Sequence, residues 1–341
     1  EEGKFYVWNQ TEIESILEQH AHLFIEAYDV HTAGNWEGKT ILNRTNNDRP
    51  YSTEEEGILA DCRDQLFAER KKRIHPGWDD KVLADWNGLM IAAIAHTGTA
   101  FNQGEWVNAA QRAFDFVVKT MSENGKLYHA YRDGKVNHTA TLDDYTGMIR
   151  AGISLYEITG APNCLTAAES WVTVVNDQFW DQEDGGYFFT ADDAEALIVR
   201  TKSAADNATP AGNSVMVANL ARLYYLTGNT AYRDRADQTT AAFSGELDKN
   251  FFPFAALMNS AELLQRGVQI AIIGDRGNPD CRALLSAIYS VNLMNKIISV
   301  TAPTDSLPDN HPASGKEQSA ATATAYVCVG MTCSLPITDP E

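Results

Sequence analysis

The chain has 341 residues, enough for two domains or one large domain, and its 44% hydrophobic and 21% charged residues exclude a disordered chain, a collagen-like fibre and a long coiled coil. No apolar run reaches the roughly 18–20 residues that a membrane span requires, so we expect no membrane partner. The formal net charge of −19 would repel a phosphate backbone, which argues against a nucleic-acid partner.

The first residues and the cysteines bear on the origin of the chain. The N-terminus lacks both a Met and the apolar stretch of a signal peptide, so we interpret the chain as a fragment or processed product of a cytoplasmic protein. There are five cysteines, an odd number that fits reduced thiols better than a disulfide framework.

The dominant pattern along the chain is a repeat of paired helices. Apolar helices end in Thr-Gly at Gly98, Gly160 and Gly228, roughly every 65 residues, and glycine just past a helix is a typical C-cap. A second, amphipathic helix follows each glycine. The first helix of each pair is apolar nearly all round and must therefore be covered on every side.

Short aromatic stretches connect the helical pairs. Gly125–Tyr128 and Gly186–Phe189 are predicted strands, and the second of them is expected to form a hairpin with Leu197–Arg200. Thr141 and Asp144 have the spacing of a capping box at the start of the next apolar helix.

The last seventy or so residues break this helical pattern. Gln269–Ile273 and Lys296–Val300 are strand-like with a helix between them, which predicts a βαβ unit with parallel strands. Pro303–Gln318 is predicted to be an exposed loop. We therefore expect two parts, residues 1–267 and residues 268–341.

Buried inner helices alternating with half-exposed outer helices favour a ring over an open solenoid. The expected fold is mainly α, an (α/α)6 toroid with short connecting hairpins, in which residues 1–267 lack the first helices and residues 268–341 pack on the toroid.

Several stretches resemble the YyaL-like thioredoxin-domain-containing family, which is related to a spermatogenesis-associated protein. The matching stretches are Glu2–Trp8, Gly34–Gly38, Asp79–Met90, Leu142–Tyr145, Gly212–Ser214 and Cys328–Cys333, followed by Pro336 and Asp339-Pro340. The resemblance implies a six-hairpin glycosidase-like toroid. It also implies, as a partner in the full-length protein, an N-terminal thioredoxin-like domain that this chain lacks.

The starts of the inner helices should converge on one mouth of the toroid, where several acids would meet. Glycoside cleavage needs two carboxyl groups with different pKa values. We expect Asp143 or Asp144 as one member of the catalytic pair and Asp80 or Asp85 as the other. The alternative for Asp85 is an N-cap, and the alternative for Asp144 is the capping box with Thr141.

Polar and aromatic side chains beside these acids are the expected substrate-binding groups, because aromatic rings pack against the C–H faces of sugars. For each ring the alternative is core packing, and for Lys81 it is a structural ion pair. The expected substrate-binding residues are Trp36, Lys81, Trp86, Asn87, Tyr145, Asn213 and Ser214.

Histidines and cysteines offer other chemistry. His96, at the far end of its helix, and His129, in a connection, are poorly placed for an epimerase, so we rank that reaction below hydrolysis. No metal site or cofactor is predicted. Cys328 and Cys333 are expected to be reduced thiols, with a redox pair as the alternative.

Two functions follow from these patterns. The first is a carbohydrate-active domain with an acidic and aromatic site, acting by a glycoside-hydrolase-like reaction on a small-molecule carbohydrate. The second is a non-catalytic module that binds a carbohydrate or a protein for the thioredoxin-like domain. A fold alone does not decide between them.

Overall fold

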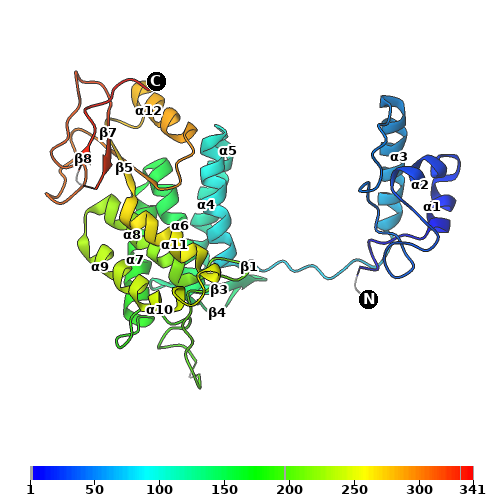
Figure 1. Ribbon diagram of the computed structural model, residues 1–341, viewed down its shortest axis with the longest axis horizontal. Coiled ribbons are helices and arrows are strands. Elements are labelled where there is room, and N and C mark those ends of the chain that lie inside the picture. Colours follow the sequence, from blue (N-terminus) through cyan, green and yellow to red (C-terminus); the bar gives the residue numbers. More distant parts are fainter. Residues whose placement is uncertain (1–2, 196, 331, 341) are drawn as a thin grey trace. The chain divides into compact units, whose positions relative to one another are not determined.

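The computed structural model describes residues 3–195, 197–330 and 332–340, and it divides the chain into two compact units, Glu1–Asp80 and Lys81–Glu341 (Figure 1). The expected boundary after residue 267 lies within the second unit, where it marks the change from helical hairpins to a sheet. Among the described residues, no helix is both long and apolar enough to cross a membrane.

The first unit is a small helical body with its own core. Its elements are α1 (Gln10–Leu17), the 3-10 helix η1 (Glu18–His20), α2 (Ala21–Ala27) and α3 (Thr53–Arg70). Ile13, Phe24 and Leu59 are fully buried between these helices. Arg73 donates to the carbonyls of Phe5 and Val7 at 2.8 Å, which fastens the N-terminal segment to the end of α3.

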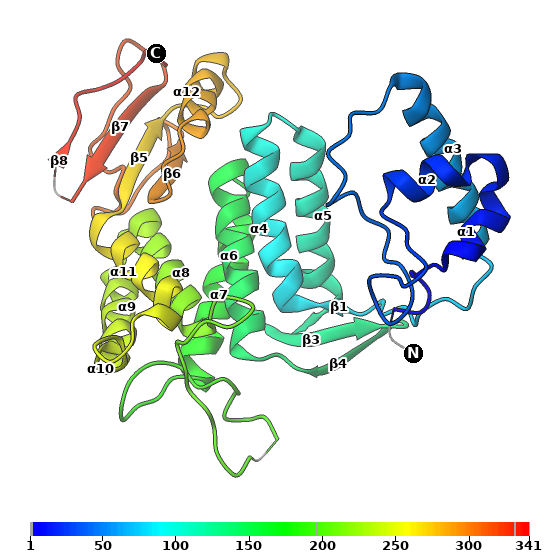
Figure 2. The same ribbon diagram turned by 45° about the vertical axis from the view of Figure 1, so that its right-hand side comes forward.

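Helical hairpins make up most of the second unit. Its helices are α4 (Ala84–Ala100), α5 (Gly104–Thr120), α6 (Leu142–Thr159), α7 (Pro162–Gln178), α8 (Gly212–Thr227), α9 (Thr230–Ala242), α10 (Ser244–Leu247), the 3-10 helix η2 (Phe252–Phe254), α11 (Ala255–Arg266) and α12 (Pro279–Ser290). Helices α4, α6, α8 and α11 pack side by side as an inner row, and α5, α7 and α9 each lie against their inner partner (Figure 2).

The sequence pattern explains which helices are inner. Helix α6 buries residues on all sides, as its nearly continuous apolar sequence predicts. Gly160 and Gly228 cap α6 and α8 in the left-handed conformation, which confirms two of the predicted C-caps. Gly98 does not, because α4 continues to Ala100. A side chain at Gly98 would press on Val107 and Trp106 of the next helix.

A small antiparallel sheet connects the first two hairpins. It consists of β1 (Val82–Leu83), β2 (Ser122–Glu123), β3 (Lys126–Arg132) and β4 (Lys135–Thr139), with β3 paired to each of the others. This confirms the strand predicted from Gly125. The predicted hairpin of Gly186–Phe189 with Leu197–Arg200 is wrong: these residues form no strand, and they are joined to their neighbours by single bonds such as Phe189 N–H to the Thr201 carbonyl.

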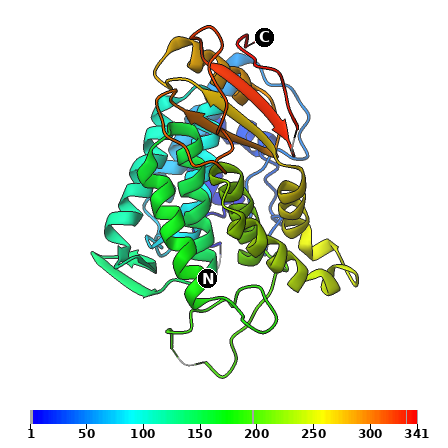
Figure 3. The same cartoon turned by 90° about the vertical axis from the view of Figure 1, so that its left-hand side faces the viewer.

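The C-terminal sheet confirms the predicted βαβ unit and adds to it. Strands β5 (Val268–Ile273) and β6 (Lys296–Thr301) are parallel, with α12 between them in sequence. The sequence analysis missed β7 (Thr324–Val329) and β8 (Thr332–Cys333), which extend the sheet in the antiparallel sense. In Figure 3 the orange and red strands lie side by side at one end of the helices.

The chain is mainly helical, with paired inner and outer helices and a small C-terminal sheet, which confirms the predicted fold class. Closure into a ring of six hairpins stays a prediction. One cysteine prediction is wrong: Cys328 and Cys333 form a disulfide, because the pairing of β7 with β8 sets them directly opposite each other. Cys62, Cys164 and Cys281 are free and buried.

Candidate acid–base site

The connecting sheet brings the starts of α4 and α6 together. Strand β1 leads directly into α4 and pairs with β3, while β4 leads into α6 and pairs with the other edge of β3. Two glycines let the helices cross closely, because a Cβ on Gly88 would collide with the backbone of Gly147. The first-turn side chains of both helices therefore meet beside β3, at the end of the helices opposite the C-terminal sheet (Figure 2).

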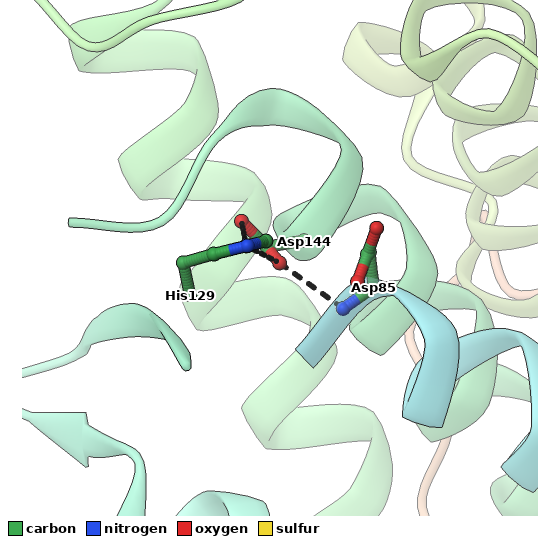
Figure 4. A group of neighbouring side chains, drawn as sticks. All are labelled: Asp85, His129 and Asp144. Carbon is green, nitrogen blue, oxygen red and sulfur yellow. Dashed lines mark hydrogen bonds and ion pairs between the residues drawn. The ribbon is translucent and has the colours of Figure 1, made fainter. Parts of the chain in front are cut away.

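Asp144 is the structural centre of this site. Its side chain is fully buried, and it accepts hydrogen bonds from the Thr141 N–H at 2.7 Å and the Thr141 hydroxyl at 3.0 Å. It also accepts from the Asp85 N–H at 3.1 Å, across to α4 (Figure 4). The role of Asp144 as the capping-box partner of Thr141 is confirmed, and the same carboxylate links two helices.

His129, on β3, is a site residue that the sequence analysis missed. Its Nδ1 lies 3.0 Å from both oxygens of Asp144 (Figure 4). Because an ionised carboxylate only accepts, Nδ1 must carry the proton, which leaves Nε2 available as a base. The hydrogen bond to Asp144 raises the pKa of His129. The only sequence signal was its place directly after the strand predicted from Gly125, in the connection that leads to the start of α6.

Asp85 lies in the first turn of α4, one residue inside the helix, so it is not the N-cap. Its Oδ1 accepts from the Trp86 N–H at 2.7 Å. Burial raises the pKa of the Asp85 carboxyl, and the negative charge of Asp144 adds to this effect. Asp85 is half-buried, so it combines access to solvent with a carboxyl group that resists ionisation.

Asp143 differs sharply from its neighbour Asp144. Its carboxylate accepts a hydrogen bond from the Gly212 N–H at the start of α8, where a Cβ on the glycine would collide with it. Burial, together with the charges of Asp144 and Asp85, raises the pKa of Asp143 to about 6. Asp143 faces a pocket of about 160 Å³ whose polar lining includes Thr201, Asn207 and Thr209.

Asp85, His129 and Asp144 also form the one group among the described residues with metal-ligand proximity, since each offers a ligand atom within 4.8 Å of the others. The hydrogen bonds decide against this use. Both Asp144 oxygens already accept N–H or O–H donors, and the Nδ1 of His129 is protonated toward them. The donor set therefore fits a hydrogen-bonded acid–base group better than a metal centre.

The remaining predicted residues of the second unit separate into open and buried groups. Trp86 is 63% exposed, and Lys81 is exposed on the same short segment. Asn87 donates to the Leu83 carbonyl at 2.8 Å and so fixes the join between β1 and α4. Lys81 lies near enough to His129 for its charge to lower the pKa of that histidine.

Three residues expected to bind substrate lie in the core instead. Tyr145 is 3% exposed, with its hydroxyl accepting from the Leu127 N–H, so its ring has no face free for a ligand. Asn213 bonds the backbone of Tyr187 and Ser203, and Ser214 bonds the Ala204 carbonyl. Their polar groups are used to hold the loop before α8. The sequence correctly predicts that these residues lie at helix starts, but it does not predict that their side chains face the core.

Asp80 and Trp36 belong to the first unit. Asp80 is exposed in the segment after α3, and Trp36 is half-buried where its ring packs against Gly3. Within the second unit, the acids that the structure gathers are Asp85, Asp143 and Asp144. Asp206, a further acid at this end, accepts from the N–H groups of Ala211 and Ala256 and so connects α8 to α11.

No family model matches the chain. Human spermatogenesis-associated protein 20 is 29% identical to it over an alignment that covers 99% of this chain and 48% of that protein. The chain thus spans about half the length of the curated relatives it matches.

Two solved structures align with parts of the chain. An α-mannanase of glycoside hydrolase family 76 from Bacteroides thetaiotaomicron overlaps 82% of this chain and 83% of its own, with 13% identity and a TM-score of 0.45. A cellobiose 2-epimerase from Spirochaeta thermophila overlaps 48% of this chain and 43% of its own, with 13% identity and a TM-score of 0.41.

Proposed function

We propose that this chain carries an acid–base site for a carbohydrate and cleaves glycosidic bonds with Asp143 as the general acid. The observation that carries the proposal is the Asp143 carboxyl, whose pKa of about 6 lies close to the pH of a cell. A carboxyl group with such a pKa holds a proton that it can give to a leaving oxygen. Asp85, the half-buried carboxyl nearby, is the proposed second member of the pair.

The surroundings of Asp143 suit a hydroxyl-rich ligand. The pocket is lined by threonine, serine and asparagine side chains and by the start of α8, and the start of a helix favours oxygen ligands. Its volume of about 160 Å³ is below the ~300 Å³ of a typical small-molecule site, so it would hold one end of a substrate rather than all of it. Trp86, exposed at the same helix starts, is the proposed stacking ring.

A second reaction has its own support. The His129–Asp144 pair has the form of an oriented general base, with Nε2 free to take a proton. Proton abstraction next to a sugar carbonyl, as an epimerase or isomerase requires, is therefore the second candidate. From the sequence alone this reaction ranks below hydrolysis, because His129 falls in a predicted connection.

Turnover of a panel of aryl glycosides by the native chain and by Asp143→Asn tests the first candidate. We expect the variant to lose at least about a hundredfold in kcat, the usual contribution of a general acid, while Asp177→Asn on the outer face of α7 keeps full activity. Equal rates for the native chain and Asp143→Asn would remove Asp143 from the mechanism.

Deuterium uptake from D2O into reducing sugars tests the second candidate. Exchange at C2 that is lost in His129→Gln and retained in Asp143→Asn would assign the chain to proton abstraction. If neither turnover nor exchange occurs while sugars still bind, the chain is a non-catalytic binding module. The thioredoxin-like domain expected from the family resemblance would then be the proposed user of that module.

A further inference from the structure

Helix α6 presents a line of residues that continues from the acid site into the molecule. Asp143, Gly147, Arg150, Ser154 and Glu157 recur at intervals of three and four, so they share one face of the helix. Contacts to both neighbours identify that face. Ser154 Oγ lies 3.2 Å from His96 Nε2 on α4, and Glu157 pairs with Arg222 on α8 at 3.0 Å.

Most cations around this face have protein partners. Arg222 binds Glu157 and also donates to the Lys296 carbonyl at 3.1 Å. Lys296 donates to the carbonyls of Ile288 and Val291, at the end of α12. Arg276 donates to the carbonyls of Glu157 and Ile158, at the end of α6. Each of these three cations therefore has hydrogen-bond acceptors within the protein.

Arg150 is the exception in this group. No described residue makes a hydrogen bond or an ion pair with its guanidinium. The side chain is open to solvent, yet surrounding protein lowers the pKa of Arg150, and Arg222 lowers it further. Arg150 shares the face of α6 that contacts α4 and α8, and these two helices are the protein that surrounds it. Among the residues that the structure describes, no carboxylate pairs with this positive charge.

The pKa of His96 is lowered in part by the same local excess of positive charge. Burial lowers its pKa to about 4, and the charges of Arg222, Arg150 and Lys296 add to the effect. The carboxylate that pairs with a cation in this cluster is Glu157, whose pKa is itself raised by burial. A positive cluster of this kind contrasts with the net charge of −19 of the chain and favours an anion that comes from outside.

We propose that Arg150, supported by Arg222 and His96, binds the oxyanion of an acidic carbohydrate, either the carboxylate of a uronic acid or the phosphate of a sugar phosphate. The planar fork of a guanidinium matches both groups. Arg150 follows Asp143 by seven residues on α6, which is about 10 Å along the helix axis. The inference rests on the proposed function, because it names the substrate class of that site.

Calorimetric titrations with four probes test the proposal: D-glucuronate, glucose 6-phosphate, glucose and inorganic phosphate. We expect at least one of the two acidic sugars to bind about tenfold or more tightly than glucose. Which of them binds more tightly distinguishes a carboxylate from a phosphate ligand. Inorganic phosphate measures the contribution of the oxyanion alone.

Three variants test whether Arg150 is responsible for the preference for acidic sugars. Arg150→Gln should remove the preference for acidic sugars, Arg150→Lys should restore part of it, and Arg112→Gln on the outer helix α5 should leave it unchanged. Far-UV circular dichroism checks that each variant is folded. Equal affinity of the native chain for acidic and neutral sugars, no binding of any probe, or an unchanged preference in Arg150→Gln would overturn the proposal.

The test of the anion site at Arg150 does not depend on whether Asp143 is the catalytic acid. Asp143→Asn should still prefer acidic sugars, because its side chain lies two turns away from Arg150. A preference that depends on Arg150, in a chain that turns over no glycoside, would reject the hydrolase and keep the anion site. Turnover of neutral glycosides without any preference for acidic sugars would keep the hydrolase and reject the anion site.

Discussion

Two adjacent aspartates at the start of α6 lie in very different environments. Asp144 points toward β3 and α4, where four N–H or O–H donors satisfy it, so burial costs it little. Asp143 points toward α8, where the donor is the Gly212 N–H and two like charges are close. The same residue type at neighbouring positions therefore becomes a structural anchor in one case and a candidate acid in the other.

The raised pKa of Asp143 has a consequence for stability. The folded chain holds this proton up to about pH 6, whereas an unfolded aspartate releases it near pH 4. The folded state thus binds more protons between these pH values, and the free energy of unfolding falls as pH rises through that window. At pH 7.5, where both states are ionised, this difference of about two pKa units costs the folded state about 3 kcal/mol.

Asp143→Asn removes that cost, since the amide is never charged and its oxygen can still accept from Gly212. Urea denaturation should find the variant more stable than the native chain at pH 7.5 by about 1–3 kcal/mol, with little difference at pH 4. A variant that is less stable by the same amount at both pH values would show that the carboxyl group is not strained by ionisation.

The sequence could predict Asp144 and Thr141 because a capping box is local: its spacing lies within four residues. It could not identify His129, because the approach of His129 to Asp144 depends on the pairing of β3 with β4, the strand that leads into α6. Tyr145 was misplaced for a related reason. Its position in the first turn was evident, but the side of the helix that packs against Phe179 was not.

At the scale of the elements, the close crossing of α4 and α6 holds the site together. The crossing depends on Gly88 and Gly147, where the two backbones meet without side chains between them. The sequence shows both glycines inside apolar helices, where glycine normally weakens a helix by about 1 kcal/mol relative to alanine. Here the close approach offsets that loss and sets the hydrogen bond from Asp85 to Asp144.

Gly88→Ala should therefore destabilise the chain by more than about 2 kcal/mol, because the new methyl group would press on the Gly147 backbone and part the helices. Gly57→Ala is a matched control within a helix of the first unit, where a Cβ would meet no atom within 4 Å. Alanine there should stabilise by about 0.5–1 kcal/mol. Thermal unfolding that shows equal effects of the two substitutions would contradict the close-crossing argument.

At the scale of the whole molecule, the chain has separate hydrophobic cores. The core of the first unit is built by Trp8, Phe24 and Leu59 among others. Of the residues that the structure describes, it shares no buried one with the large core that contains Phe114 and Ile149. The sequence analysis did not separate them, since apolar periodicity identifies helices but not the core into which each helix packs. Cores without common residues allow two cooperative units to open with different free energies.

Matched substitutions test this independence. Phe24→Ala and Phe114→Ala each remove a fully buried ring, 0% and 1% exposed, and each should cost its own unit about 3–5 kcal/mol. Hydrogen exchange measured by mass spectrometry should then show faster exchange in α1, α2 and α3 for Phe24→Ala, with α6 and α8 unchanged. Phe114→Ala should give the reverse pattern. Faster exchange throughout the chain in both variants would mean that the two cores unfold as one, because a single cooperative unit loses its protection everywhere when any part of it is weakened.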